Sequence, residues 1–281
     1  MGEGPARLVL VGTPIGNLGD LPPRAAEAFA AADVVACEDT RRTGRLLQHL
    51  GIRAPKLVRL DEHTEHSTAS ELIRRITVDG QVIAVASDAG MPGLSDPGAL
   101  IVKAAAEADV LIEVIPGPFA GAVALVGSGL LDATGRFVFE GFLPRKGAER
   151  QSRLAQLTEE RRTIVLYEAP HRLIRTLADL ADALGPERGV ALCRELTKLH
   201  EETFRGSLAE ALAHSELVAP RGEYVVVVEA APQPEEVSDE QLLAALGVAI
   251  DGGSSRRDAA MAVAGRFGVG LNRVKGLALG S

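Results

Sequence analysis

The loop SDAGMPGLSDPG, residues 87–98, combines two acids with three glycines and two prolines. Asp88 ends an almost wholly apolar run, where a carboxylate is unfavourable unless it accepts hydrogen bonds or meets a ligand. We therefore favour a ligand hydroxyl or ammonium group as the partner of Asp88 over satisfaction by protein groups alone. Asp96 has a simpler interpretation, because Asp followed by Pro97 is typical of a helix N-cap and a first helical residue.

A second polar segment, CEDTRRT at residues 37–43, places two acids beside two arginines. The helix dipole stabilises acids at a helix start, which is one interpretation of Glu38 and Asp39. It does not explain the paired cations Arg41 and Arg42, which suit phosphate groups if neighbouring loops converge. Further cations fall near strand-to-loop junctions: Arg24, Arg145, Lys146, Arg172, Arg194 and Lys198. The open alternative is scattered surface charge without a common ligand.

The segment GTPIGNLGD, residues 12–20, places glycines directly after an apolar run. They lack the G-x-G-x-x-G spacing of a dinucleotide site, and Pro14 removes one amide donor. A tight turn accounts for Gly12 but leaves Thr13 and Asn17 unexplained. The chain also lacks a G-x-S-x-G motif and any ligand cluster with zinc spacing, so we expect neither a hydrolase triad nor a metal site.

The elements that position these loops follow from the alternation of apolar and polar runs. The first half repeats a short β-rich run, a polar loop and a helical stretch, which predicts a largely parallel sheet in an α/β fold. Its five runs are residues 7–12, 33–39, 56–61, 81–88 and 111–117. Because ligands bind beyond the carboxyl ends of parallel strands, the polar loops are predicted to share one site.

The second half is predicted to form another α/β domain with a mixed sheet, because some of its strands are too close in sequence for crossover helices. Its runs are residues 136–142, 163–169, 189–196, 200–206 and 223–230. A helix is predicted over residues 171–184, after Pro170 and before Gly185.

Prolines and acids in residues 230–240 indicate a linker, and the residues after it fit two or three short helices. We therefore predict three parts. They are a parallel-sheet N-terminal domain over residues 1–118, a mixed-sheet C-terminal domain over residues 119–232 and a small helical appendage over residues 239–281.

Composition excludes several classes of protein. A chain of 281 residues with 46% hydrophobic content suits two medium domains. The formal charge of −8 argues against a non-specific nucleic-acid binder but not against a local basic patch. The sequence shows no disulfide framework, no signal-peptide pattern and no run of 18 apolar residues. We expect a cytoplasmic protein without a membrane span.

Taken together and in order, these segments resemble the tetrapyrrole methylase superfamily, and within it the ribosomal RNA small-subunit methyltransferases that modify a cytidine ribose 2′-oxygen. The resemblance covers residues 7–230 almost without a gap. The segments that carry it are LVGTPIGNLGDLPPRA, VVACEDTRRTGRLLQHLGI, SDAGMPGLSDPG, VIPGPFAGAVALVGSGL, FEGFLPRKGAER, VLYEAPHRLIRTL, CRELTKLHEETFRG and GEYVVVVE. Met91 and Phe119 stand where this family usually has Thr and Ser.

The resemblance implies a homodimeric two-domain enzyme that binds S-adenosylmethionine between its domains, uses no metal, and acts on 16S ribosomal RNA or the 30S subunit. The cofactor-binding residues that it implies are Asp88, Gly90, Met91, Pro116, Gly117, Ala120, Tyr167 and Ala169. The RNA-binding residues that it implies are Thr13, Asn17, Arg41, Arg42, Arg145, Lys146, His171 and Arg172.

Methyl transfer to a ribose hydroxyl is an in-line displacement, for which the protein supplies alignment and a dry cleft. A base helps late in the reaction, because the hydroxyl is a very weak acid. We predict Glu38 or Asp39 as this base, with Glu195 and Lys198 behind them.

Two other functions stay open. One is a methylase that acts on carbon atoms of a porphyrin-like ring or on a protein side chain. The other is a non-catalytic ribosome-assembly factor that binds RNA. The basic C-terminal helices are predicted to serve either RNA binding or packing in the dimer or the core.

Overall fold

The computed structural model describes residues 5–53, 55–61, 64–231 and 237–280. The chain divides into two compact units, of which the first ends at Ala231 and the second begins at Pro232. The first unit contains both sheets, and the second contains three helices. Among the described residues, no helix has the length and apolar character needed to cross a bilayer.

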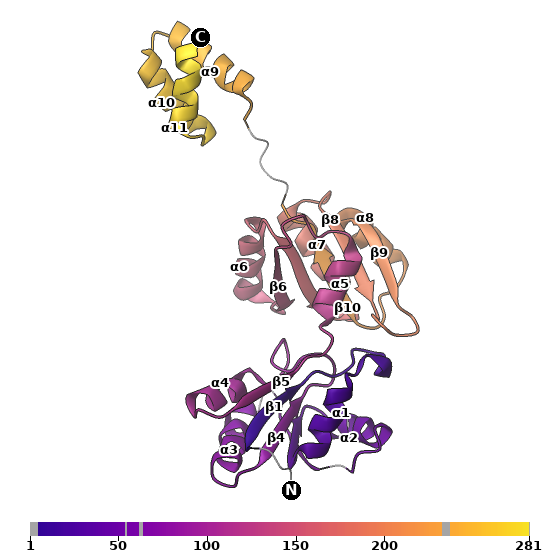
Figure 1. Ribbon diagram of the computed structural model, residues 1–281. Helices are drawn as coiled ribbons and strands as arrows, with labels where there is room; N and C mark the ends of the chain where they lie inside the picture. The colour runs from indigo at the N-terminus through magenta and orange to yellow at the C-terminus, as the bar shows by residue number, and fades with distance from the viewer. Residues whose placement is uncertain (1–4, 54, 62–63, 232–236, 281) are drawn as a thin grey trace. The chain divides into compact units, whose positions relative to one another are not determined.

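The first sheet has five parallel strands in the order β3-β2-β4-β1-β5. They are β1 (Arg7–Val11), β2 (Val34–Cys37), β3 (Lys56–Arg59), β4 (Val82–Ala86) and β5 (Ile112–Ile115). Helices α1 (Pro23–Ala31) and α2 (Thr40–His49) cover one face, and α3 (Glu65–Thr77) and α4 (Ala99–Glu107) cover the other (Figure 1). Strands β2 and β4 are buried along their whole length, because both faces are covered, and this explains their unbroken apolar runs.

The second sheet is mixed, with the order β6-β7-β10-β8-β9. Its strands are β6 (Phe137–Phe142), β7 (Thr163–Glu168), β8 (Gly189–Arg194), β9 (Glu202–Ser207) and β10 (Tyr224–Val228). Strands β6 and β7 are parallel, whereas β10 runs antiparallel to both β7 and β8. Helices α6 (Gly147–Thr158), α7 (Pro170–Leu184) and α8 (Leu208–Leu217) share one core with the sheet, and α5 (Ala120–Ser128) packs in a separate cluster.

The predicted strands and the mixed character of the second sheet are confirmed. All ten strands fall within or at the edges of the predicted runs, and the long helix ends before Gly185 as predicted. One helix start was wrong: α4 begins at Ala99 with Gly98 as its N-cap, so Asp96 does not cap it. The two cysteines are free and buried, in agreement with the absence of a disulfide framework.

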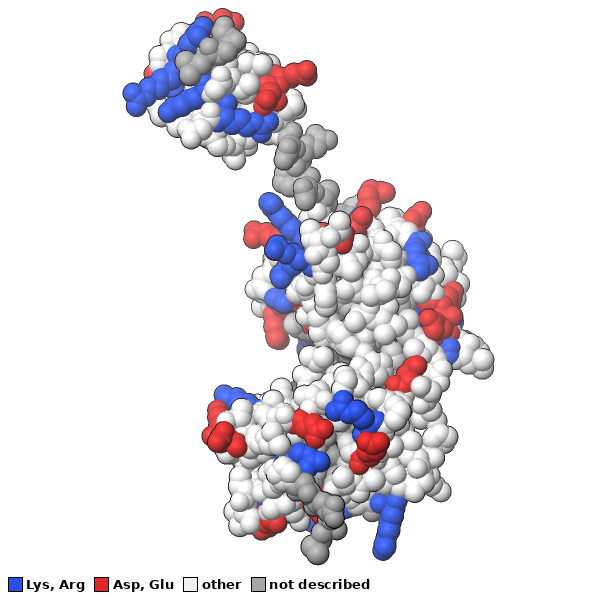
Figure 2. Space-filling model, in the orientation of Figure 1, with Lys and Arg blue, Asp and Glu red and all other residues white. Residues whose placement is uncertain are grey.

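The C-terminal unit consists of α9 (Asp239–Asp251), α10 (Arg256–Phe267) and α11 (Leu271–Gly280). These helices bury a small core of their own, which includes Leu242, Val263 and Val274. Among the charged side chains on the face of this unit that Figure 2 shows, Lys and Arg cover more of the surface than Asp and Glu. Part of the predicted linker, residues 232–236, lies outside the described residues.

Candidate active site

Two glycine-rich loops are joined at the carboxyl edge of the first sheet. The amide of Thr13 donates to the carbonyl of Gly90 at 2.9 Å, and the amide of Gly90 donates to the carbonyl of Thr13 at 3.0 Å. The Thr13 hydroxyl also donates to the Ser87 carbonyl at 3.2 Å. The loop after β1 and the loop after β4 therefore form one joined wall, as the parallel order of the strands predicted.

The backbones of Gly12 and Gly117 approach each other without room for a side chain. A Cβ atom on Gly12 would lie 2.5 Å from the Gly117 Cα and 2.7 Å from the Met91 Sδ. The Gly117 amide donates a hydrogen bond to this sulfur at 3.3 Å. Only glycine fits at positions 12 and 117, because the two backbones are in direct contact there. The Met91 side chain packs against this contact, which we call the glycine crossing.

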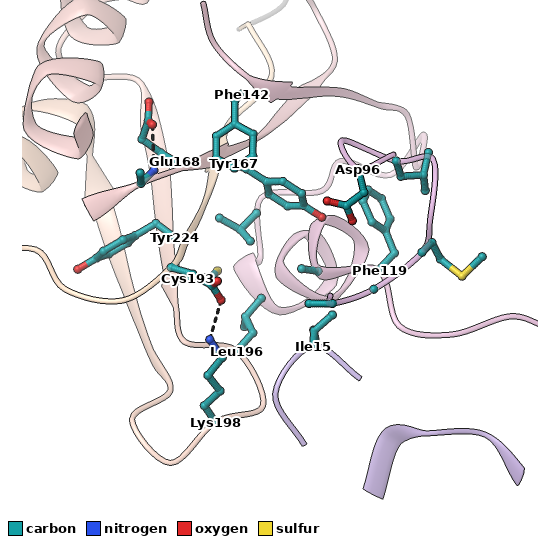
Figure 3. A pocket seen from close by; sticks show the side chains of 18 of the residues that line it. Ile15, Asp96, Phe119, Phe142, Tyr167, Glu168, Cys193, Leu196, Lys198 and Tyr224 are labelled. Atoms are coloured by element: carbon teal, nitrogen blue, oxygen red, sulfur yellow. Dashed lines mark hydrogen bonds and ion pairs between the residues drawn. The ribbon is translucent and has the colours of Figure 1, made fainter. Parts of the chain in front are cut away.

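A cavity of about 330 Å³ lies between this wall and the second sheet (Figure 3). Ile15, Gly90 and Met91 line it on the side of the joined loops, and Tyr167 and Val225 line it on the side of the second sheet. Most of the lining is apolar, with few polar side chains, which is typical of sites for small molecules and cofactors.

One wall of the cavity is aromatic. Phe119 and Tyr167 pack edge to face against Phe139, with ring centroids 4.9 and 5.0 Å apart. Phe142 packs in the same way on Tyr167 at 5.7 Å. Such pairs stabilise beyond their area burial. Phe119 is the residue before α5 and gives it no side-chain cap, so the replacement of the usual Ser extends the apolar wall.

Asp96 points into this cavity, and the sequence interpretation of it as a helix cap is therefore replaced (Figure 3). The backbone has φ of 63° at Ser95 and 138° at Gly98, so the segment turns sharply before α4 begins. Burial, followed by the charges of Glu38 and Asp88, raises the pKa of Asp96 to about 7. This carboxyl group changes its charge near neutral pH, which is typical of functional groups in clefts.

The hydroxyl of Tyr167 lies in the same part of the cavity (Figure 3). Burial raises its pKa to about 12, and the negative charge of Asp96 adds to this effect. Tyr167 therefore stays neutral. Its oxygen accepts a hydrogen bond from the Gly121 amide, and its hydroxyl proton can be donated to a ligand.

Protein groups satisfy Asp88, which was predicted to meet a ligand. Its Oδ1 accepts the Asp39 amide at 3.2 Å, and its Oδ2 lies 3.3 Å from the Arg42 guanidinium. The Asp88 amide in turn donates to the Glu38 Oε1 at 3.1 Å. Asp88 and Glu38 thus tie the end of β4 to the end of β2, and the cavity lining begins at the next residue, Ala89.

Glu38 and Asp39, the two predicted bases, do not line the cavity. Asp39 caps α2 by accepting the Arg41 amide at 2.8 Å, and hydrogen bonding from the Arg41 side chain lowers its pKa. Burial raises the pKa of Glu38. For Asp39, the helix-start interpretation describes the structure better than a catalytic role.

Lys198 does line the cavity, and two carboxylates hold its ammonium group. Its Nζ donates to Glu195 at 3.0 Å and to Glu223 at 2.6 Å. Burial alone would lower the pKa of Lys198, but these hydrogen bonds outweigh it and raise the pKa. Lys198 is therefore a cation at neutral pH, not a base.

The segment around Lys198 has an unusual backbone. Glu195 and Thr197 have φ of 50° and 64°, which is rare for residues other than glycine and for a β-branched residue especially. Gly16 packs on this segment, since a Cβ there would lie 3.0 Å from the Leu196 carbonyl oxygen. The segment thus joins the glycine-rich loop after β1 to the second sheet.

The residues predicted to bind the cofactor do not all lie in the same cavity. Gly90, Met91, Ala120, Tyr167 and Ala169 all line the cavity. Pro116 and Gly117 line a neighbouring depression instead. Sequence reasoning missed Asp96 and the apolar residues Ile15, Leu196 and Val225, because their place in the cavity depends on how the two sheets pack.

The residues predicted to bind RNA lie in several places. Thr13 and Arg42 line a second cavity, which other residues of the joined loops also line. Asn17 caps a short 3₁₀ helix, Leu18–Asp20, and Arg41 pairs with Asp39 at 3.3 Å. Arg145, Lys146 and His171 are exposed near the starts of α6 and α7.

Arg172 has a structural role that a phosphate contact would disturb. Its Nε lies 3.0 Å from the buried carboxylate of Glu168, and its Nη2 donates to the Leu143 carbonyl at 2.6 Å. Glu168 also accepts the Thr176 hydroxyl at 2.5 Å and the Ala169 amide at 2.9 Å. Arg172 thus holds the end of β7, beside the cavity, and we do not propose it as an RNA contact.

This network predicts a stability effect. Replacing Glu168 with alanine removes the carboxylate that pairs with the Arg172 guanidinium and accepts the Thr176 hydroxyl. Breaking such a buried pair costs about 3 kcal/mol. Urea unfolding followed by circular dichroism measures this loss. The control is Glu149→Ala, an exposed residue of α6, which should change the free energy of unfolding by less than about 0.5 kcal/mol. Equal effects of the two substitutions would show that the network does not stabilise the fold.

Comparison with known proteins agrees with this geometry. The family model of tetrapyrrole (corrin/porphyrin) methylases matches residues 7–212. A protein of Synechocystis sp. named ribosomal RNA small subunit methyltransferase I is 50% identical over 229 residues, which are 82% of this chain and 80% of the relative. The chain belongs to the tetrapyrrole methylase family, in the branch of the ribosomal RNA small subunit methyltransferases I. As a member of this family it is a methyltransferase.

A second member of this branch covers more of the chain. The Mycobacterium tuberculosis protein of the same name is 45% identical over 259 residues, which are 92% of this chain and 89% of the relative. The match therefore extends beyond the two sheets into the C-terminal helices.

Solved structures of the tetrapyrrole methylase family share the fold. The methyltransferase CobJ matches with a TM-score of 0.62 and 19% identity over 80% of this chain and 95% of its own. Uroporphyrin-III C-methyltransferase from Thermus thermophilus, crystallised with S-adenosyl homocysteine, matches with a TM-score of 0.56 and 18% identity over 79% of this chain and 96% of its own. At this identity the likeness concerns the fold alone.

Proposed function

We propose that this tetrapyrrole methylase uses S-adenosylmethionine to methylate the 2′-oxygen of a cytidine ribose in small-subunit (16S) ribosomal RNA, acting in the cytoplasm as a homodimer. The observation that carries the proposal is the cavity between the two sheets. It combines an aromatic wall, glycine-rich loops and one carboxyl group that titrates near neutral pH. The names of the relatives support the class of substrate.

The residues of the cavity fit the cofactor. Its apolar and aromatic lining suits the adenosine part, since bases stack on aromatic faces. Gly90 has φ of 88°, a backbone conformation that other residues rarely adopt, and glycine therefore lets the loop turn where it lines the cavity. Tyr167, Ala120 and Met91 would hold the cofactor together with Gly90. Bound S-adenosylmethionine supplies a methyl group that its sulfonium sulfur activates for transfer.

Asp96 is the proton acceptor in this proposal, in place of Glu38 or Asp39. It is the carboxyl group that faces the cavity without an ion-pair partner among the residues that the structure describes. A base with a pKa near the working pH is the most effective, and its raised pKa meets that condition. S-adenosylmethionine would supply the methyl group and leave as S-adenosylhomocysteine, and a carboxylate oxygen of Asp96 would accept the proton of the ribose hydroxyl.

Lys198 and Glu195, which were predicted to stand behind the base, have other roles in this proposal. The Lys198 ammonium lines the cavity, and two of its three N–H donors are engaged by Glu195 and Glu223, which leaves one for a ligand acceptor. Glu195 holds it in place and also accepts the Glu223 amide at 2.9 Å. Arg42, Arg145, Lys146 and His171 remain our proposed contacts to the RNA backbone.

The proposal is tested by mapping ribose methylation on ribosomal RNA from cells with and without this gene. Loss of one 2′-O-methylcytidine from small-subunit RNA in the deletion strain, and its return with the intact gene, is the expected result. An unchanged pattern of ribose methylation would contradict the proposed substrate.

A further inference from the structure

A second cavity, of about 350 Å³, is lined by residues of the same joined loops, but not by those that line the active-site cavity. Its lining includes Thr13 and Gly16 from the loop after β1, and Arg42, Arg45 and His49 from helix α2. Residues three, four and seven apart share one face of a helix, so these three side chains form a single row along α2. We call this cavity, with its row of basic residues, the α2 groove.

The charges of the α2 groove are only partly balanced. Arg42 is engaged with Asp88, although its side chain is still 62% exposed. Arg45 and His49 are exposed, and neither forms an ion pair with any carboxylate in the part of the chain that the structure describes. The Arg45 Nε makes a single hydrogen bond, to the Arg41 carbonyl at 3.4 Å. The groove thus presents two basic side chains that have no ion-pair partner among the residues that the structure describes.

Arg41 shows how specific this row is. It belongs to the same helix, but its guanidinium turns to Asp39 and does not line the groove. The basic character of the α2 groove therefore comes from positions 42, 45 and 49, and of the two adjacent arginines only Arg42 contributes to it.

The α2 groove and the active-site cavity share one wall. Ile15, Ala89 and Gly90 line the active-site side, whereas Pro14, Gly16 and Asp88 line the groove side. The hydrogen bonds between Thr13 and Gly90 fix this wall. A polymer that places one unit in the active-site cavity and continues over the wall therefore reaches the row of donors on α2.

We propose that the α2 groove binds the phosphodiester backbone of the nucleotides next to the target ribose, with Arg45 and His49 as its principal donors. This inference rests on the proposed RNA substrate. Arginine provides a planar set of N–H groups that fits phosphate oxygens, and histidine adds a further donor. Such contacts fix the register of the strand and carry no sequence information.

The test compares Arg45→Glu, His49→Ala and the double variant with the unchanged chain. The probe is the 30S subunit from cells that lack this gene, and its affinity is measured at several salt concentrations. Arg45→Glu should weaken binding about tenfold, as the loss of a charge-assisted hydrogen bond implies. The dependence of the logarithm of affinity on the logarithm of salt concentration should flatten by about 1. The KM for the subunit should rise in parallel while kcat and the Kd for S-adenosylmethionine stay unchanged.

The matched control is Lys103→Glu, an equal change of charge on α4, which lies on the other face of the first sheet. It should leave both affinities unchanged. If Arg45→Glu and the double variant bind and methylate the subunit as the unchanged chain does, the groove does not hold RNA. If their Kd for S-adenosylmethionine rises instead, the groove belongs to the cofactor site. An unchanged chain that neither binds nor methylates the subunit would overturn the proposed function along with the groove.

Discussion

Replacing Gly12 with alanine should lower the affinity for S-adenosylmethionine at least about tenfold and lower the melting temperature. The new Cβ would lie 2.5 Å from the Gly117 Cα and 2.6 Å from the Gly117 nitrogen, which is closer than a Cβ atom comes to non-bonded atoms in proteins. These are backbone atoms, so no side chain can turn away to relieve the contact. The loop after β5 has to move, and Met91, which bonds to Gly117, has to move with it. Calorimetry with S-adenosylmethionine and thermal unfolding measure the two effects.

The matched control for this substitution is Gly127→Ala. Gly127 lies in α5, where a Cβ would meet open space. Alanine in a helix is favoured over glycine by about 1 kcal/mol, so this variant should be as stable as the unchanged chain or more stable. Normal cofactor affinity in Gly12→Ala would show that the glycine crossing does not shape the cofactor site.

Replacing Asp96 with asparagine should slow single-turnover methyl transfer about a hundredfold, the lower end of what general-base catalysis contributes. Asparagine keeps the shape of the side chain but cannot accept a proton. In the unchanged chain the rate should rise with pH and level off above about 7, because the carboxyl group acts when ionised. The variant should lose this dependence. A rate and a pH profile equal to those of the unchanged chain would remove Asp96 from the reaction.

Asp96 also predicts how stability changes with pH. Its pKa in the folded chain is about 7, well above the ordinary value of 3.8, mainly because of burial. Between these two values the folded chain holds a proton that the unfolded chain releases, so the contribution of Asp96 to stability falls as pH rises and levels off above 7. Asp96→Asn removes this contribution. The melting temperature of the variant minus that of the unchanged chain should therefore increase as the pH rises from 5 to 8.

The elements of the fold were predictable from the sequence because each signal is local. The strands of a parallel sheet covered on both faces read as short apolar runs, and β2 and β4 show this clearly. The convergence of the loops after β1 and β4 also followed, because parallel strands that are neighbours end at the same edge. The resemblance to the family then identified five residues that do line the cavity.

The set of residues that line the cavity was less predictable, because it depends on packing between the two sheets and on backbone angles. Asp96 followed by Pro97 has the sequence of a helix cap, yet the turn at Ser95 and Gly98 aims its carboxyl group into the cavity. Arg172 was predicted to bind RNA, but in the structure its guanidinium pairs with the buried carboxylate of Glu168. Asp88, at the end of an apolar strand, was predicted to meet a ligand, whereas its partners in the structure are the Asp39 amide and the Arg42 guanidinium.

The most direct test of the proposed function uses the purified chain, S-adenosylmethionine with a labelled methyl group, and 30S subunits from cells that lack the gene. After transfer, the RNA is digested to nucleosides, which are separated and identified by mass spectrometry. We expect one labelled nucleoside, 2′-O-methylcytidine. A label on a base atom would contradict the proposal. So would RNA that stays unlabelled although the same chain methylates a porphyrin-like ring in a parallel reaction.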